Sequence, residues 1–299
     1  MTSSSKIQQD ARGTPMSTCM PESLDDYERA LRQFQSYFGD PTVTLAKTLE
    51  RDPEFVVGHI FNASAMLMMT ERQYLPDALD SIEKAEALAH KSNDREKGLL
   101  AGARHWMEGR WDMATVVWDQ VLAEYPRDAL ALQLAHLTDF FLGDAVNLRD
   151  RIGRVIGSWS ETTPGYSYIL GMQAFGLEEC NQFARAEETA MKALSIEARD
   201  GWSVHAMAHV LEMQNRYEEG QQLCVPGSMI GRQETVLRSI TGGIWRCFTW
   251  SKRISSALCN SMTNRYCRAS LTCRCRCWTP RRYCGVCICR MSTSVIAGL

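Results

Sequence analysis

The sequence of 299 residues lacks long apolar runs. No stretch reaches the roughly 18 consecutive apolar residues that a membrane-spanning helix requires. Its first residues contain no apolar core flanked by basic residues, so they do not resemble a secretory signal peptide. We therefore predict a cytoplasmic protein without a membrane partner, in which residues 1–21 form a polar, disordered tail. Disulfide bonds rarely persist in that reducing compartment.

The signatures of common enzyme classes are also missing. The chain contains neither a Gly-rich phosphate loop of the G-x-x-x-x-G-K type nor a G-x-S-x-G nucleophile turn. Ser203 stands two positions from His205, and two such side chains on a helix point in different directions. The sequence thus predicts a non-enzymatic protein with no catalytic residue and no cofactor.

Acidic residues are missing from the last part of the chain. After Glu234 there is no Asp or Glu, whereas residues 225–299 contain 12 Lys or Arg. Residues 1–224 are acidic instead, with 34 Asp or Glu against 21 Lys or Arg. Cysteine follows the same division, because the first 223 residues hold only two of the twelve cysteines. We therefore expect two segments of different origin on either side of residue 224.

The Cys/Arg-rich segment 224–299 admits three interpretations. Its C-x-C and C-x-x-C spacings, from Cys273 to Cys289, are typical of zinc or copper ligands. A disulfide-rich or basic interaction tail is the second interpretation. The third is a shifted reading frame: leucine codons such as CTG, read one base late, begin with TG and give Cys or Trp, and alanine codons frequently give Arg. A frame shift within an Ala- and Leu-rich region explains the composition best. It predicts that the amino-acid sequence of this segment is unreliable and that the segment is not a folded domain.

Residues 22–223 follow a helical pattern almost throughout. Apolar residues recur at helical spacing between short Gly, Pro, Asp or Asn interruptions, with almost no strand-like alternation. Turn residues recur as well, since Gly109, Gly143, Asn181 and Asn215 are 34, 38 and 34 residues apart. Such a period is typical of stacked helix pairs, because one pair cannot bury its apolar face alone. We predict an all-α fold, a tetratricopeptide-like helical-repeat α-solenoid.

The same pattern locates individual helices. The best-marked helix covers 113–124 and is followed by Tyr125-Pro126, which ends it. A weaker and earlier unit is centred on Gln73-Tyr74. The first helices of three successive pairs are expected at about 129–142, 165–179 and 200–214.

Three stretches carry a more specific pattern: "DPEFVVGHIFNASAML" (52–67), "WDQVLAEYPRDALALQLAH" (118–136) and "ALSIEARDGWSVHAMAHVLEM" (193–213). Together they resemble the tetratricopeptide repeat protein 38 family over residues 22–223. The resemblance implies an α-solenoid of paired helices in an intracellular protein. It implies no enzymatic activity and supplies no catalytic residue.

The first helices of such pairs usually line the concave binding surface. None of the three predicted first helices contains Lys or Arg, which argues against an acidic peptide or a nucleic acid as the partner. Tyr166, Tyr168 and Trp202 indicate an apolar or aromatic groove instead. We expect a scaffold or adaptor that binds an apolar or amphipathic helical segment of a protein or peptide partner.

A second hypothesis concerns His205, His209 and Glu212. Together with Trp202 they are separated by three, four and three residues, which places all four on one helical face. Two histidines one turn apart and a carboxylate could hold a transition metal. The H-E-x-x-H pattern of zinc proteases is missing, since Ala206 follows His205. Ordinary packing of the histidines between helices is the simpler interpretation, so we predict these residues as groove candidates and keep metal binding as the alternative.

Overall fold

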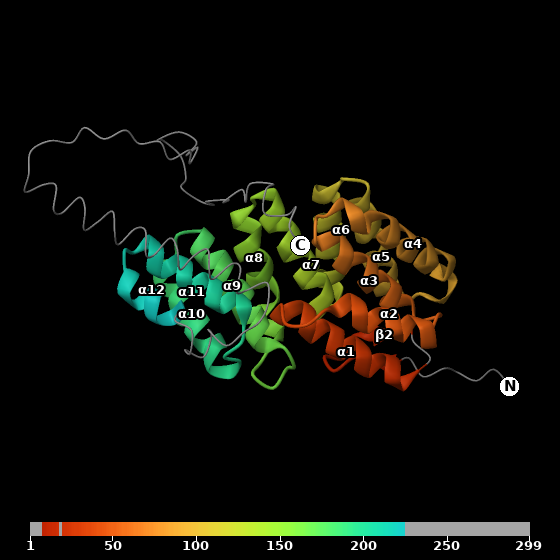
Figure 1. Cartoon of the computed structure of the whole chain (residues 1–299), viewed down its shortest axis with the longest axis horizontal. Helices are drawn as coiled ribbons and strands as arrows, with labels where there is room; N and C mark the ends of the chain where they lie inside the picture. Colours follow the sequence, from red (N-terminus) through yellow and green to blue (C-terminus); the bar gives the residue numbers. More distant parts are fainter. Residues whose placement is uncertain (1–7, 18–19, 225–299) are drawn as a thin grey trace, which may run out of the picture. The chain divides into compact units, whose positions relative to one another are not determined.

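The computed structural model describes residues 8–17 and 20–224. These residues form twelve α-helices, three short 3-10 helices and one small hairpin, which confirms the predicted all-α class (Figure 1). The helices are α1 (Pro21–Ser36), α2 (Pro41–Arg51), α3 (Val56–Met68), α4 (Leu75–Ala87), α5 (Asp94–Met107), α6 (Trp111–Glu124), α7 (Ala129–Leu142), α8 (Ala145–Val155), α9 (Tyr166–Glu179), α10 (Phe183–Ile196), α11 (Gly201–Met213) and α12 (Tyr217–Cys224). The 3-10 helices are η1 (Arg72–Tyr74), η2 (Ala89–Lys91) and η3 (Ile156–Ser158).

Two findings concern the predictions about segments and membranes. The Cys/Arg-rich residues 225–299 lie outside the described part of the chain, so the three interpretations of that segment stay predictions. Among the described helices, none combines the length and the apolar character needed to cross a membrane.

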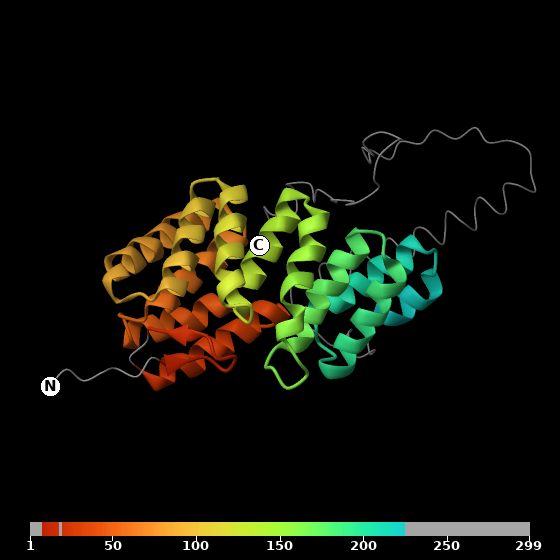
Figure 2. The same ribbon diagram turned by 180° about the vertical axis from the view of Figure 1, so that it is seen from behind.

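Consecutive helices pack as pairs, from α1 with α2 to α11 with α12, and the second helix of each pair also contacts the first helix of the next. Figures 1 and 2 show the pairs following one another in chain order. Short connections make sequential neighbours antiparallel. Each first helix is thereby covered on several sides, which explains why α3, α7, α9 and α11 are buried over most of their length.

The four predicted turn residues have the backbone conformation that the repeat requires. Gly109, Gly143, Asn181 and Asn215 adopt φ values of 78°, 70°, 59° and 60°. Glycine and asparagine enter this left-handed region most readily. Helices α6, α8, α10 and α12 each begin two residues later. The repeated turn positions are therefore confirmed.

Two further turns of the same kind were not predicted. Gly39 (φ 89°) lies two residues before α2, and Thr70 (φ 56°) lies two residues before η1, which leads into α4. Threonine rarely adopts a positive φ, so the sequence gives little indication of the turn at Thr70. All six helix pairs of the described residues thus use a left-handed residue at the same position.

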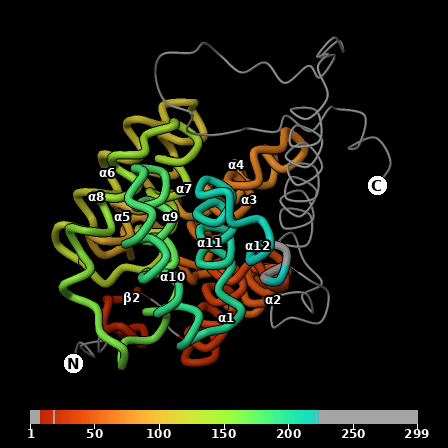
Figure 3. Tube along the Cα trace, turned by 90° about the vertical axis from the view of Figure 1, so that its left-hand side faces the viewer, coloured from red at the N-terminus to blue at the C-terminus, as the bar shows by residue number. Residues whose placement is uncertain are grey.

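Helix α1 also contacts helices that are not its neighbours in the sequence. It packs against α7 and α11, which belong to the fourth and sixth pairs (Figure 3). Tyr37, the residue that follows α1, lies edge-on against Trp202 of α11, with ring centroids 5.9 Å apart. In an extended solenoid each repeat touches only its neighbours. The first pair therefore covers part of the surface that the later first helices present.

The amino-terminal segment corrects the prediction of a disordered tail over residues 1–21. Residues 8–17 form a hairpin in which β1 (Gln8–Gln9) pairs antiparallel with β2 (Pro15–Met16). Inside its turn, Asp10 accepts hydrogen bonds from the backbone amides of Arg12 and Thr14 at 2.9 and 2.8 Å. Gly13 adopts φ 82°, a conformation that favours glycine. The hairpin is held locally by one carboxylate.

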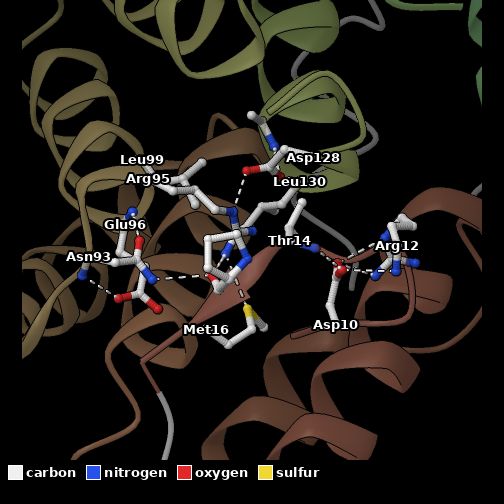
Figure 4. Close-up of polar contacts among 12 residues, drawn as sticks. Asp10, Arg12, Thr14, Met16, Asn93, Arg95, Glu96, Leu99, Asp128 and Leu130 are labelled. Carbon is white, nitrogen blue, oxygen red and sulfur yellow. Dashed lines mark hydrogen bonds and ion pairs between the residues drawn. The ribbon is translucent and has the colours of Figure 1, made fainter. Parts of the chain in front are cut away.

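Side chains of α5 fix this hairpin to the helices (Figure 4). The Arg95 guanidinium donates to the Pro15 carbonyl at 3.1 Å and pairs with the Asp128 carboxylate at 2.6 Å. Glu96 accepts a hydrogen bond from the Ser17 amide at 2.8 Å. Arg95 and Glu96 lie about 80 residues from the hairpin in sequence. The sequence of residues 8–17 alone therefore does not reveal these contacts.

Candidate functional site

The aromatic residues predicted to line an open groove are mostly parts of the core. Trp202 is 6% exposed and Tyr168 is 8% exposed. Tyr166 is half-buried, and the Lys192 ammonium lies 5.6 Å from the centre of its ring. The prediction of an open groove is therefore wrong for Trp202 and Tyr168. Tyr37, which follows α1, packs against Trp202 from a distant part of the chain and contributes to its burial.

Trp202 is the centre of a cluster of rings. Its ring centroid lies 5.0 Å from that of His136 and 4.7 Å from that of Phe175. His136 belongs to α7 and Phe175 to α9, so one side chain joins three first helices and the end of α1. Contacts of this number are typical of a buried packing residue.

His136 is a buried neutral imidazole in this cluster. Its Nε2–H donates to the Met172 carbonyl at 3.2 Å. Burial lowers the pKa of His136 to about 3, and the nearby Arg151 guanidinium acts in the same direction. An unfolded chain titrates its histidines near a pKa of about 6.5. Below that pH, only the unfolded chain can bind the proton, so the free energy of unfolding falls as the pH decreases.

We therefore predict that His136→Gln makes the protein less sensitive to acid. From about pH 7.5 to about pH 5.5, the wild type should lose about 1.4 kcal/mol more stability than the variant, the free energy of roughly one proton over one pH unit. Urea unfolding at both pH values measures the difference. His90→Gln, at an exposed histidine, serves as the control. An equal loss in wild type and His136→Gln would show that His136 is not held neutral by the fold.

A row of aromatic rings crosses the helix pairs near the turns between first and second helices, from the end of α5 and the start of α6 to the second half of α9. We call the residues Trp106, Trp111, Phe141, Phe140 and Phe175 the aromatic row. The centroids of successive rings are 4.6, 6.1, 5.7 and 5.7 Å apart. Both ends of the row are buried, whereas its three middle rings are half-buried. The row therefore presents apolar surface to the solvent between α5 and α9.

The turn between α7 and α8 enlarges this apolar surface. Leu142 directly follows the aromatic row and is 45% exposed, and Val146 at the start of α8 is 57% exposed. Neither residue was predicted from the sequence to belong to a site. Their signal was available, since both lie within three residues of the predicted turn at Gly143.

His205 and His209, predicted to share one face of α11, lie side by side. The ring centroids of His205 and His209 are 4.3 Å apart, and Phe175 packs edge-on against His205 at 5.2 Å. Burial lowers the pKa of His205 to about 3, with His209 as a second cause. His205 is therefore a neutral imidazole next to His209.

Two carboxylates of α9 join His209, and the sequence analysis did not anticipate them. Glu178 Oε2 lies 3.2 Å from His209 Nδ1. Burial alone lowers the pKa of His209, but the carboxylates of Glu178, Glu179 and Glu212 together outweigh burial, and the net shift is upward. Glu179 lies beside them, and burial together with Glu178 raises its pKa to about 6. Glu178 and Glu212 occupy equivalent positions in the repeated sequence pattern, because each stands three residues before a turn asparagine.

The residues predicted to form one site thus lie in different parts of the structure. Tyr166 and Tyr168 lie in the first turn of α9, whereas Glu178 and Glu179 lie in its last turn. At a rise of about 1.5 Å per residue these turns are well separated. Within the described residues, the group of potential ligand atoms lying within 4.8 Å of one another comprises Glu178, Glu179 and His209, without His205 or Glu212.

A surface cleft lies elsewhere in the described residues. It measures about 360 Å³ and is lined by the hairpin turn and by the connection between α6 and α7, including Arg12, Gly13, Tyr125 and Arg127. The Arg12 guanidinium is already paired with Asp10. The cleft contains none of the predicted site residues.

No family model matches the chain, and no solved structure matches it. The described residues themselves define the class: an all-α protein of consecutive helix pairs, with a partly buried aromatic row and a cluster of imidazole and carboxylate groups.

Proposed function

We propose that this chain is a non-enzymatic helical-repeat scaffold or adaptor that binds an amphipathic helical segment of a partner protein. The proposal includes a tetratricopeptide-like repeat over residues 22–223, related to the tetratricopeptide repeat protein 38 family, and a cytoplasmic location. The binding surface is the aromatic row together with Leu142 and Val146. Trp202 and Tyr168 are left out of it because they are buried.

The observation that carries this proposal is the half-buried middle of the aromatic row. Its rings are 4.6–6.1 Å apart. On the exposed face of a helix, side chains three or four positions apart have a similar spacing, about 5–6 Å between Cβ atoms. A helical segment with apolar residues at positions i, i+3, i+4 and i+7 can therefore place side chains against the three half-buried middle rings.

The charges of the first helices that carry the aromatic row support an apolar rather than an acidic partner. Helix α5 contains Arg95, Lys97 and Arg104, but each of them is paired with a carboxylate. Helices α7, α9 and α11 contain no Lys or Arg. A groove that captures a carboxylate or a phosphate needs cationic donors of this kind. Large exposed apolar patches on a protein commonly mark interaction sites.

The test uses the full chain and a displayed library of helix-forming peptides. We expect enrichment of peptides with an apolar stripe at helical spacing. Phe141→Asp, in the middle of the row, should weaken the binding of such a peptide by at least about tenfold, as is usual for a central interface residue. Fluorescence anisotropy of the labelled peptide measures the change.

A matched control distinguishes specific binding at this surface from nonspecific peptide binding. Val43→Asp changes a residue of α2 that is 51% exposed and lies outside the aromatic row. It should alter peptide affinity by less than about twofold. Enrichment of acidic or extended peptides, or an equal effect of Phe141→Asp and Val43→Asp, would overturn the proposed function.

A further inference from the structure

The carboxyl ends of α9 and α11 gather negative charge. Glu178 and Glu179 lie in the last turn of α9, and Glu212 lies in the last turn of α11. The two helices pack directly against each other. A helix carboxyl end carries a partial negative charge from its free carbonyl groups, so carboxylates there are unfavourable without a cation. This place therefore attracts a cation.

Within the part of the chain that the structure describes, few cations are supplied to these two helix ends. Neither α9 nor α11 has a basic residue in its last turn. Arg216 follows α11, but its guanidinium forms ion pairs with Glu187 at 2.7 Å and with Glu219 at 2.7 Å. Arg149 pairs with its neighbour Asp150. These arginines are thus committed to other carboxylates.

The distances within the cluster fit a small metal ion. Ligand atoms of Glu178, Glu179 and His209 all lie within 4.8 Å of one another, and the His209 Nδ1 to Glu178 Oε2 distance is 3.2 Å. Zinc binds imidazole nitrogen and carboxylate oxygen at about 2.0–2.2 Å, which makes neighbouring ligands of a tetrahedron about 3.3–3.5 Å apart. Small side-chain adjustments would bring all three groups to that spacing.

The position of the cluster allows an ion to reach it. The side chain of His209 is 28% exposed, whereas that of Glu178 is 7% exposed. Glu179 is half-buried. His205 packs against His209 and limits the movement of its ring. One side of the cluster is therefore fixed by the protein, and the other faces the solvent.

We propose that Glu178, Glu179 and His209 bind one divalent first-row transition-metal ion between the ends of α9 and α11. This ligand set differs from the sequence prediction of His205, His209 and Glu212, with which it shares only His209. Three protein ligands leave a coordination position for water. One imidazole and two carboxylates suit manganese, iron or zinc better than copper(I), which prefers sulfur. The inference is independent of the aromatic row and of the proposed peptide binding.

The test titrates the full chain with Mn²⁺ and measures free Mn²⁺ by electron paramagnetic resonance. Manganese is the appropriate probe because the cysteines of residues 225–299 favour softer ions. We expect saturable binding of about one Mn²⁺ per chain, and release of that ion by Zn²⁺, which binds such ligands more tightly. Glu179→Gln, at a half-buried helix end, should weaken Mn²⁺ binding by at least about tenfold.

Three substitutions distinguish this site from its neighbours. His90→Gln and Glu188→Gln change residues outside the cluster and should leave Mn²⁺ affinity within about twofold. Glu212→Gln, which removes a carboxylate of the sequence-predicted set, should have an effect of less than about threefold. Circular dichroism verifies that each variant is folded.

Two results would overturn the inference. The first is the lack of saturable Mn²⁺ binding up to about 1 mM, a concentration that corresponds to only weak affinity. The second is equal Mn²⁺ affinity of the wild type and Glu179→Gln. In either case the cluster is an ion pair between His209 and Glu178. A larger effect of Glu212→Gln than of Glu179→Gln would show that the sequence-predicted ligands bind instead.

Discussion

Replacing Arg95 with methionine is expected to reduce the free energy of unfolding by about 3–5 kcal/mol, because it leaves a buried carboxylate without its partner. The side chains of Arg95 and Asp128 are both 0% exposed. Arg95 also donates to the Pro15 carbonyl and to the Tyr27 hydroxyl. One substitution therefore removes contacts to the hairpin, to α1 and to the start of α7 (Figure 4).

Urea unfolding, followed by circular dichroism, measures this loss. Arg104→Met is the matched control, because Arg104 lies on α5 like Arg95 and pairs with Glu86 of α4 at a more exposed position. Ion pairs near the surface contribute about 0–1 kcal/mol. Similar losses in the two variants would contradict the importance of the buried pair.

A second measurement on Arg95→Met reports on the hairpin alone. Arg12 is 4% exposed in the folded chain, which protects the bond after it from trypsin. Loss of the Arg95 contacts should release the hairpin and increase the rate of cleavage after Arg12. Arg12 also pairs with Glu28, a residue of α1, at 2.6 Å. An unchanged rate at this bond would show that the ion pairs of Arg12 with Asp10 and Glu28 are sufficient to hold it.

Trp202→Ala is expected to destabilise the protein by about 3–5 kcal/mol, the usual cost of removing a large buried aromatic side chain. The ring contacts Tyr37, His136 and Phe175, which come from three different parts of the chain. The surrounding helices cannot close the resulting cavity without moving relative to one another. Thermal or urea unfolding detects the effect directly.

Trp111→Ala provides the comparison, since Trp111 is a half-buried tryptophan of the aromatic row. It should cost clearly less than Trp202→Ala, because less of its surface is removed from water. A double-mutant cycle with Tyr37→Leu and Trp202→Leu should give a coupling of about 0.5–1.5 kcal/mol, as aromatic pairs in contact do. Additive effects would mean that α1 and α11 do not interact through these rings.

The sequence predicted helices best where the residues at both ends have a specific role. The helix expected at 129–142 is α7, Ala129–Leu142. At its start, the Asp128 carboxylate accepts hydrogen bonds from the amides of Leu130 and Ala131. At its end, Gly143 adopts the left-handed conformation. Both signals are local, so the pattern of residues was sufficient to place the helix.

Features that depend on distant residues could not be predicted in this way. The hairpin of residues 8–17 has strands of only two residues and is held by α5. The rings around Trp202 come from distant parts of the chain, among them Tyr37 and His136. The approach of Glu178 to His209 depends on how α9 packs against α11. In each case the local sequence is compatible with another outcome, and only tertiary contacts decide between them.

The contact between α1 and α11 has a consequence for how the chain folds. Tyr37 and Trp202 are separated by 165 residues. In a repeat protein with only neighbouring contacts, the terminal pairs can fray independently of each other. Here the first and last pairs stabilise each other, so we expect them to unfold in one cooperative step. Because contacts of such separation form slowly, the first pair completes its packing only after α11 has left the ribosome.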